Sequence, residues 1–150
     1  IIFLFSFIAL ISAFFIEHIL GHQPCNLCLI ERIPYGLSIM IIMAIFLIKK
    51  NQKLLVLLLI LTFIFSLIIS FYHFGIEQGF FEESSVCGVK SLTESITKED
   101  LLKQLSEKTI SCRDVTFRIF GLSLTSINIV ISLLFIITLL KIFNEYEKNQ

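Results

Sequence analysis

Two cysteines separated by two residues, Cys25 and Cys28, form the stretch of this chain best suited to chemistry. Cysteines at this spacing can close a small disulfide ring, or they can remain a dithiol in which one sulfur is favoured as the thiolate. If a helix begins near Cys28, its unpaired amide groups and the positive end of its dipole favour a thiolate there. Arg32 follows four residues later, on the same face of such a helix. We interpret this stretch as a redox centre.

The composition places this centre in a membrane protein. Of the 150 residues, 56% are hydrophobic and only 16% are charged, which is far too apolar for a soluble domain. The formal net charge of +0 gives no indication of binding to nucleic acid. We predict an all-α fold, an integral membrane four-helix bundle that forms one domain over residues 1–150.

Four apolar runs are long enough to cross a bilayer, which takes about 20 residues. A cleaved signal peptide is the alternative for the first run, but no Ala-x-Ala cleavage site precedes Gly21 and the run exceeds a typical signal core. Since the sequence opens inside an apolar run, we expect a short N-terminal piece to be missing. The predicted spans are about residues 1–20, 28–48, 54–74 and 119–143, with outer loops at about 21–27 and 75–118.

Pro34 shapes the start of the second span, because it cannot donate a hydrogen bond to the carbonyl of Ile30. Either the regular helix begins near Ile33 with Pro34 in its first turn, or it begins earlier and kinks there. An arginine at this boundary of the membrane is costly, which favours a functional role for Arg32. It can stabilise a thiolate, or a ligand oxygen that gains charge during reduction. The alternative is that Arg32 only reaches toward the interface.

Basic residues predict the orientation of the bundle. Lys49, Lys50 and Lys53 lie between the second and third spans, and such a cluster marks the cytoplasmic side. Both termini are then cytoplasmic, and the two other loops face the periplasm of a bacterial inner membrane. In the second of these loops, residues 97–108 begin with a capping-box pattern and continue as a short amphipathic helix. This helix lies on the membrane surface or packs on the ends of the bundle.

The four cysteines lie in or at the edge of the two outer loops, although inert cysteines would scatter into the spans. Disulfides persist on that oxidising side, which suggests a close pair, Cys25–Cys28, and a loop pair, Cys87–Cys112. A zinc site made of all four is disfavoured, because zinc ribbons usually have two close pairs and the loop pair is 25 positions apart. We therefore predict no metal. Purely structural disulfides are the stronger alternative, but so small a ring adds little stability.

The pattern Pro-Cys-x-Leu-Cys-x-x-x-Arg-x-Pro-Tyr, from Pro24 to Tyr35, resembles the signature of the disulfide bond formation protein B (DsbB) family. The likeness extends to the four spans, the basic turn, the two-cysteine loop and the Phe-Gly-Leu of residues 120–122. The chain departs from the family at residues 125–127, where Thr-Ser-Ile replaces a common Pro-x-Trp. The related vitamin K epoxide reductases carry their Cys-x-x-Cys late, in the last span, which argues against that family.

The resemblance implies an enzyme that reoxidises the periplasmic thioredoxin-fold oxidase DsbA and passes the electrons to ubiquinone or menaquinone. It implies that Cys87 forms the mixed disulfide with the partner and that Cys112 exchanges with Cys25. Cys28 would be the thiolate that faces the quinone. Two further residues would lie at the quinone, with Arg32 contacting its oxygen and His73, at the outer end of the third span, close by.

Two other functions remain open from the sequence. One is a related oxidase that serves a single dedicated thiol substrate, which the partner-contacting loop does not distinguish. The other is a membrane scaffold whose disulfides only stiffen its outer loops, and a scaffold would not require the arrangement of Cys28 and Arg32.

Overall fold

The computed structural model describes residues 1–48, 51–82, 87, 111–113, 118–119 and 122–148. The amphipathic helix predicted at residues 97–108 and two lysines of the basic turn lie outside the described residues. The elements are α1 (Ile2–His18), α2 (Asn26–Ile30), α3 (Ile33–Leu47), α4 (Gln52–Glu77), β1 (Arg118–Ile119), β2 (Leu122–Ser123) and α6 (Leu124–Lys148).

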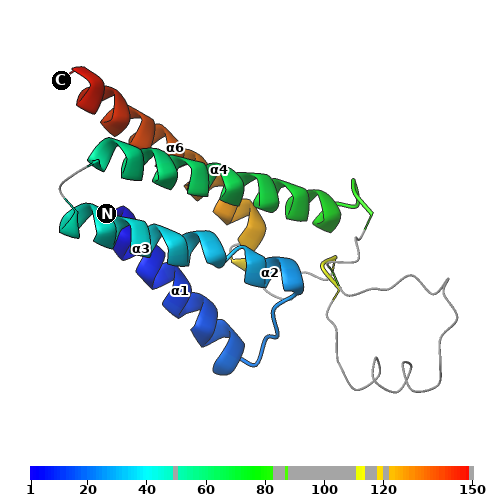
Figure 1. Ribbon diagram of the computed structural model, residues 1–150. Coiled ribbons are helices and arrows are strands. Elements are labelled where there is room, and N and C mark those ends of the chain that lie inside the picture. The colour runs from blue at the N-terminus through cyan, green and yellow to red at the C-terminus, as the bar shows by residue number, and fades with distance from the viewer. Residues whose placement is uncertain (49–50, 83–86, 88–110, 114–117, 120–121, 149–150) are drawn as a thin grey trace, which may run out of the picture.

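The helices lie side by side, with α4 packed against both α3 and α6, and α1 packed against α3 (Figure 1). The C-terminus lies at one end of this bundle, together with the end of α3 and the start of α4 (Figure 1). The opposite end holds α2, the end of α4 and the start of α6, and we call it the cysteine end because Cys25 and Cys28 lie there.

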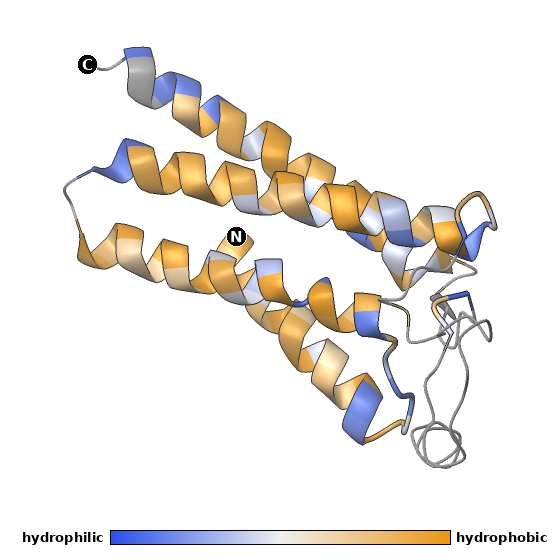
Figure 2. Ribbon diagram, turned by 45° about the vertical axis from the view of Figure 1, so that its right-hand side comes forward, coloured by the Kyte–Doolittle hydropathy of each residue, from blue (hydrophilic) through white to orange (hydrophobic). Residues whose placement is uncertain are grey.

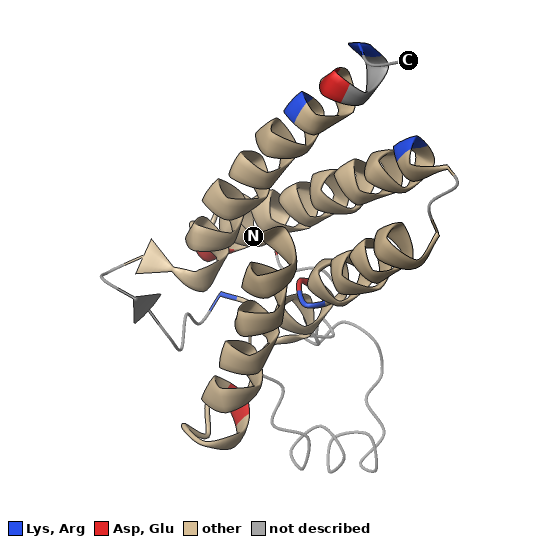
Figure 3. Cartoon of the chain, turned by 90° about the vertical axis from the view of Figure 1, so that its left-hand side faces the viewer, with Lys and Arg blue, Asp and Glu red and all other residues tan. Residues whose placement is uncertain are grey.

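Three stretches are long and apolar enough to cross a membrane: residues Asn26–Leu47, which comprise α2 and α3, then Gln52–Glu77, and Leu124–Glu145. Helix α1 is also apolar, but it has 17 residues and spans only about 25 Å at the helical rise. The sides of the helices are apolar over most of their length, and the charged residues gather near the helix ends (Figures 2 and 3). The prediction of a mostly helical membrane protein is therefore confirmed.

The boundaries of the elements differ from the predicted spans at several points. Helix α4 continues to Glu77, three residues beyond the predicted end of the third span. The fourth span begins at Leu124 and not near Ile119, because β1 and β2 first form an antiparallel pair. Strands of two residues are too short to show an alternating pattern in the sequence, so the all-α prediction missed them.

The centre of the bundle is an apolar cluster around Phe63, whose side chain is completely buried. Its ring lies edge-on to Phe135, with centroids 5.0 Å apart. Small polar side chains join the helices: the hydroxyl of Ser132 donates to Ser66 at 3.3 Å, between α6 and α4. Such residues let helices approach closely in a membrane, and their hydrogen bonds are worth under about 1 kcal/mol each. The cluster comprises Tyr35, Val56, Leu59, Ile60, Phe63 and Leu139.

Candidate redox site

Cys25 is the N-cap of α2, and its sulfur accepts a hydrogen bond from the backbone amide of Cys28 at 3.3 Å. A side chain at this position normally accepts from the second or third amide of the helix, which is the role of Cys25 here. The helix then breaks after Ile30 and resumes at Ile33, with Pro34 in the first turn of α3. Since Pro34 has no amide hydrogen, it makes no helical hydrogen bond to the carbonyl of Ile30. The chain is therefore helical before Pro34, as one of our two alternatives expected, and a regular helix also begins at Ile33, as the other expected.

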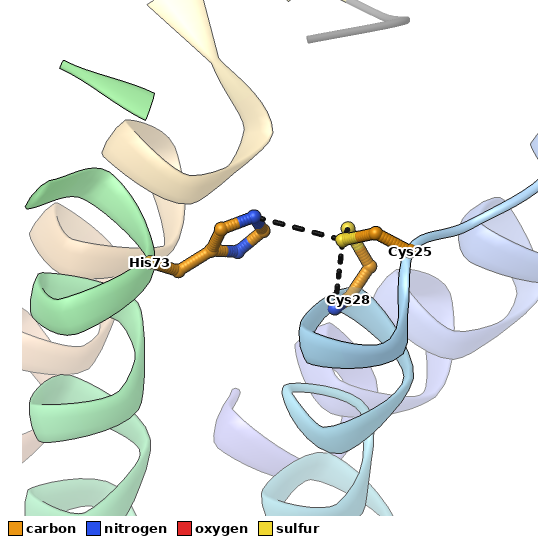
Figure 4. A group of neighbouring side chains, drawn as sticks. All are labelled: Cys25, Cys28 and His73. Atoms are coloured by element: carbon orange, nitrogen blue, oxygen red, sulfur yellow. Dashed lines mark hydrogen bonds between the residues drawn. The ribbon is translucent and has the colours of Figure 1, made fainter. Parts of the chain in front are cut away.

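The two thiols of the Cys-x-x-Cys motif lie against a histidine from α4 (Figure 4). The sulfurs of Cys25 and Cys28 are 2.6 Å apart and share a hydrogen bond. The imidazole Nε2 of His73 lies 3.6 Å from the sulfur of Cys25. Cys25 and His73 are buried, whereas Cys28 is partly exposed. The structure thus brings together Cys25 of the predicted first outer loop, Cys28 of the second span and His73 of the third.

The other ring nitrogen of His73 faces a buried carboxylate. Its Nδ1 lies 3.0 Å from Oε1 of Glu31 and 3.3 Å from the hydroxyl of Thr125. The side-chain amide of Asn128 donates to Oε2 of Glu31 at 3.3 Å. With a proton on Nδ1, the ring donates to Glu31, and Nε2 either accepts the proton of Cys25 or, once protonated, donates to its thiolate.

Further polar groups from α3 and α4 hold Asn128 in place. Its amide nitrogen donates to the hydroxyl of Ser70 at 2.7 Å, and its carbonyl oxygen accepts from the hydroxyl of Tyr35. Because buried polar groups stabilise a site only when each is paired, this chain of contacts fixes the Glu31 carboxylate firmly. Asn128 thus links α6 to Glu31, to Ser70 of α4 and to Tyr35 of α3.

The contacts around Cys25 favour a thiolate on this sulfur. The hydrogen bond from the Cys28 thiol is the largest influence and lowers the pKa of Cys25 below its ordinary value, assisted by His73 and opposed by burial. The sequence analysis expected the favoured thiolate at Cys28 instead. The reason for the difference is that the helix begins at Asn26, so its unpaired amide points back to the capping residue.

Arg32 points away from this network, toward α1. Its Nη1 lies 2.5 Å from Oε2 of Glu17, and its guanidinium lies 5.6 Å from the centroid of the Phe14 ring. Glu31 and Arg32, between α2 and α3, therefore point in different directions, Glu31 to His73 and Arg32 to Glu17.

Cys87 and Cys112 are joined in a disulfide, and both are buried. They belong to the same apolar cluster as Cys25, Leu27 and Ile76. All four cysteines therefore gather at the cysteine end, and the two pairs pack into one buried cluster.

Four polar residues of the site were not predicted as site residues: Glu17, Glu31, Thr125 and Glu77. Glu77 accepts a hydrogen bond from Thr125 at 2.7 Å, and its Oε1 lies 3.9 Å from Nε2 of His73. The sequence offered one signal for this group, because an acidic residue at a membrane boundary is costly unless it is paired. Glu31 and its partner His73 are 42 positions apart along the chain, so no local pattern could have identified this contact.

A thiol, an imidazole and a carboxylate in this order can move protons during thiol chemistry. His73 can take the proton of Cys25 when this sulfur attacks or is oxidised, and Glu31 can stabilise the resulting imidazolium. The paired Cys28 can form a disulfide with the same sulfur. The site is therefore equipped for two-electron exchange between a dithiol and a disulfide.

Comparisons with known proteins agree with this chemistry. The uncharacterized protein RP370 of Rickettsia prowazekii (strain Madrid E) is 31% identical over 136 residues, which cover 89% of this chain and 79% of that protein. The family described as disulfide bond formation protein DsbB matches residues 1–142, nearly the whole chain. The chain belongs to the DsbB family, as the motif from Pro24 to Tyr35 predicts.

Proposed function

We propose that this protein is a thiol:quinone oxidoreductase of the bacterial inner membrane that reoxidises a periplasmic DsbA-type dithiol oxidase. The observation that carries the proposal is the buried cluster that unites the two cysteine pairs at one end of the bundle. Since that end lies opposite the C-terminus, a cytoplasmic C-terminus would place all four cysteines in the periplasm.

The proposed relay begins at the loop disulfide. A thiolate of the partner attacks Cys87, which releases Cys112, and the second partner thiol then displaces Cys87 to complete the partner's disulfide. Cys112 attacks Cys25 and frees Cys28. Cys87 then attacks Cys112 in this mixed disulfide and re-forms the loop disulfide. Cys25 and Cys28 are left as a dithiol that carries the two electrons. Each step exchanges one disulfide for another, so its rate depends on the thiolate fraction and on access.

The second half of the reaction returns Cys25 and Cys28 to a disulfide. Their two electrons and two protons pass to a membrane quinone, ubiquinone or menaquinone, which leaves as the quinol. His73 accepts the proton of Cys25, and Glu31 keeps the ring in the required orientation. Cys28 is the more exposed of the two thiols, which suits its role as the sulfur that faces the quinone.

The surroundings of Cys28 fit an apolar ring substrate that arrives from the bilayer. Leu29 and Ile33 expose apolar side chains on either side of the helix break. Arg32 offers several N–H donors of which the contact with Glu17 uses Nη1, so the guanidinium can also contact a quinone oxygen. A charged donor of this kind stabilises the negative charge that develops on the oxygen during reduction.

The role of the loop pair is tested by Cys87→Ala. We expect this variant to lose oxidation of the partner and to retain quinone reduction when a small dithiol such as dithiothreitol serves as the donor. The small dithiol reaches Cys25 and Cys28 directly, so this second reaction is the control for folding. Normal oxidation of the partner by the variant would refute the relay.

The dedicated-oxidase alternative predicts a different pattern. Quinone reduction would then proceed with dithiothreitol, whereas a DsbA-type oxidase would give no turnover even with all four cysteines present. A scaffold would show no quinone reduction with either donor.

A further inference from the structure

We propose that the reduced thiols of Cys25 and Cys28, together with His73, form a binding site for a thiophilic divalent cation such as Zn²⁺, and that the bound ion holds both cysteines as a dithiol. Each cysteine offers its sulfur and His73 offers a ring nitrogen, and these three atoms all lie within 4.8 Å of one another. The sulfurs come from the start of α2 and the nitrogen from α4, so an ion here would join two helices (Figure 4).

The donor set suits zinc. Two cysteine sulfurs and one histidine nitrogen, with a fourth position open to water, are a known ligand set of zinc in proteins. Tetrahedral coordination at about 2.3 Å from each sulfur would separate the sulfurs by about 3.8 Å. They are 2.6 Å apart here, so the Cys28 side chain would have to turn away from Cys25. Its partial exposure leaves room for that rotation.

The surroundings of His73 match those of a metal-bound histidine. Such a ring usually donates its second N–H to a carboxylate, which fixes the tautomer and directs the other nitrogen to the metal. The contact of Nδ1 with Glu31 at 3.0 Å provides that support, and Asn128 holds the carboxylate from its other oxygen. This arrangement exists in the protein before any ion arrives.

The charge balance also favours a divalent ion. Both sulfurs bind the ion as thiolates, and their two negative charges neutralise the two charges of the ion. The loaded site adds no net charge to a buried position at the end of a membrane span, where an uncompensated charge would be costly. It differs from the four-cysteine site considered from the sequence, because His73 takes the place of the loop cysteines.

The consequence for activity rests on the proposed function. No electron moves when the ion binds, but the sulfur lone pairs that would form the disulfide are then engaged by the ion. The loaded protein cannot pass electrons to a quinone until the ion is removed. We infer that the dithiol stage of the cycle is reversibly inhibited by zinc, whereas the disulfide form is insensitive to it.

The test uses the full chain in detergent with Cys87→Ser and Cys112→Ser, so that Cys25 and Cys28 are the only cysteines. After anaerobic reduction and removal of the reductant, the protein is titrated with Co²⁺. We expect sulfur-to-cobalt charge-transfer absorbance that saturates at one ion per chain and is lost when Zn²⁺ is added. The oxidised protein should give no such absorbance, and no quinone is present in the assay.

Two variants test the histidine and its support. We expect His73→Asn to weaken Co²⁺ binding at least tenfold, and Glu31→Gln to weaken it by about tenfold through the loss of the outer carboxylate. His18→Asn, on the exposed end of α1, is the matched control and should bind normally. Equal helicity by circular dichroism checks that each variant is folded.

Three results would overturn the proposal: no charge-transfer absorbance with the reduced protein, the same absorbance with the oxidised protein, or unchanged affinity in folded His73→Asn. Because the measurement needs neither quinone nor partner, failure of the metal site leaves the proposed relay intact. Failure of the relay likewise leaves the metal titration interpretable.

Discussion

The sulfur of Cys25 receives three contacts at once: the thiol of Cys28, the amide of Cys28 and the ring of His73. Each favours the thiolate, and together they outweigh the cost of burying the charge. At the scale of single residues, these contacts support our proposal that Cys25 is the nucleophile of the reduced pair. In the relay, Cys28 acts as a thiolate only while Cys25 is occupied by a disulfide to Cys112.

The first prediction concerns this pKa. Cys28→Ala removes the strongest donor to Cys25 and should raise the pKa of Cys25 toward the ordinary thiol value near 8.5. Since a thiolate is the reactive form, alkylation of Cys25 at mildly acidic pH should then slow. The measurement is the rate of iodoacetamide labelling against pH, with a chelator present and Cys87 and Cys112 replaced by serine. An unchanged pH profile would contradict the assignment.

The second prediction concerns Arg32. Arg32→His should lower kcat/KM for the quinone about ten- to a hundredfold, because a hydrogen bond from a charged donor is worth about 1.5–3 kcal/mol. Both disulfides should still form in this variant. Glu17→Gln is the matched control, since it breaks the ion pair but keeps the guanidinium, and it should retain quinone reduction. Equal losses in both variants would mean that Arg32 acts only through its contact with α1.

At the scale of elements, the break between α2 and α3 holds two charged residues of the site, Glu31 and Arg32. Pro34 predicted the break, because a proline cannot complete the helical hydrogen bond. The directions taken by Glu31 and Arg32 were not predictable, since they depend on a histidine from α4 and a glutamate from α1. The sequence thus indicates where a helix is interrupted, but tertiary packing determines the directions in which Glu31 and Arg32 point.

The end of α4 offers a third prediction, at Gly75. A Cβ there would lie 2.1 Å from the ring of Phe81, which stacks on Tyr72 with centroids 5.7 Å apart. Gly75→Ala should therefore displace the ring and cost about 1 kcal/mol, the low end for overpacking, because Phe81 is half-exposed and can move. Thermal unfolding followed by circular dichroism in detergent measures this cost.

The matched control for this substitution is Gly36→Ala in α3, where nothing lies within 4 Å of the added Cβ. It should be neutral or slightly stabilising, because alanine favours a helix more than glycine does. Gly75→Ala combined with Phe81→Ala should cost no more than Phe81→Ala alone. If the two glycine substitutions lower stability equally, steric contact with Phe81 is not the cause.

At the scale of the whole molecule, lipid replaces water around the helices, so burial of apolar side chains contributes less than close packing does. Phe63→Ala should cost about 3 kcal/mol, the low end for this truncation in a core, because it leaves a void among helices α3, α4 and α6. Ser66→Ala should cost under about 1 kcal/mol. Unfolding in detergent compares the two, and a larger cost for Ser66→Ala would refute this view of the bundle.

The long apolar runs made the approximate positions of three membrane-spanning stretches predictable from the sequence, since the bilayer imposes their length. The strand pair before α6 and the shortness of α1 were not predicted, because neither leaves a distinctive local pattern. The convergence of Cys25, His73 and Glu31 depends on how α4 packs against α2 and α3. Such contacts between distant positions cannot be read from spacing along the chain.

The central claim is that electrons pass from a thiol partner through the cysteines to a quinone, and one measurement tests it most directly. The purified full chain in detergent receives a reduced thioredoxin-fold oxidase as donor, and the loss of quinone absorbance is followed. We predict rapid loss that disappears in both Cys28→Ala and Cys87→Ala. Absence of turnover with ubiquinone and menaquinone analogues, or turnover that persists without Cys28, would contradict it.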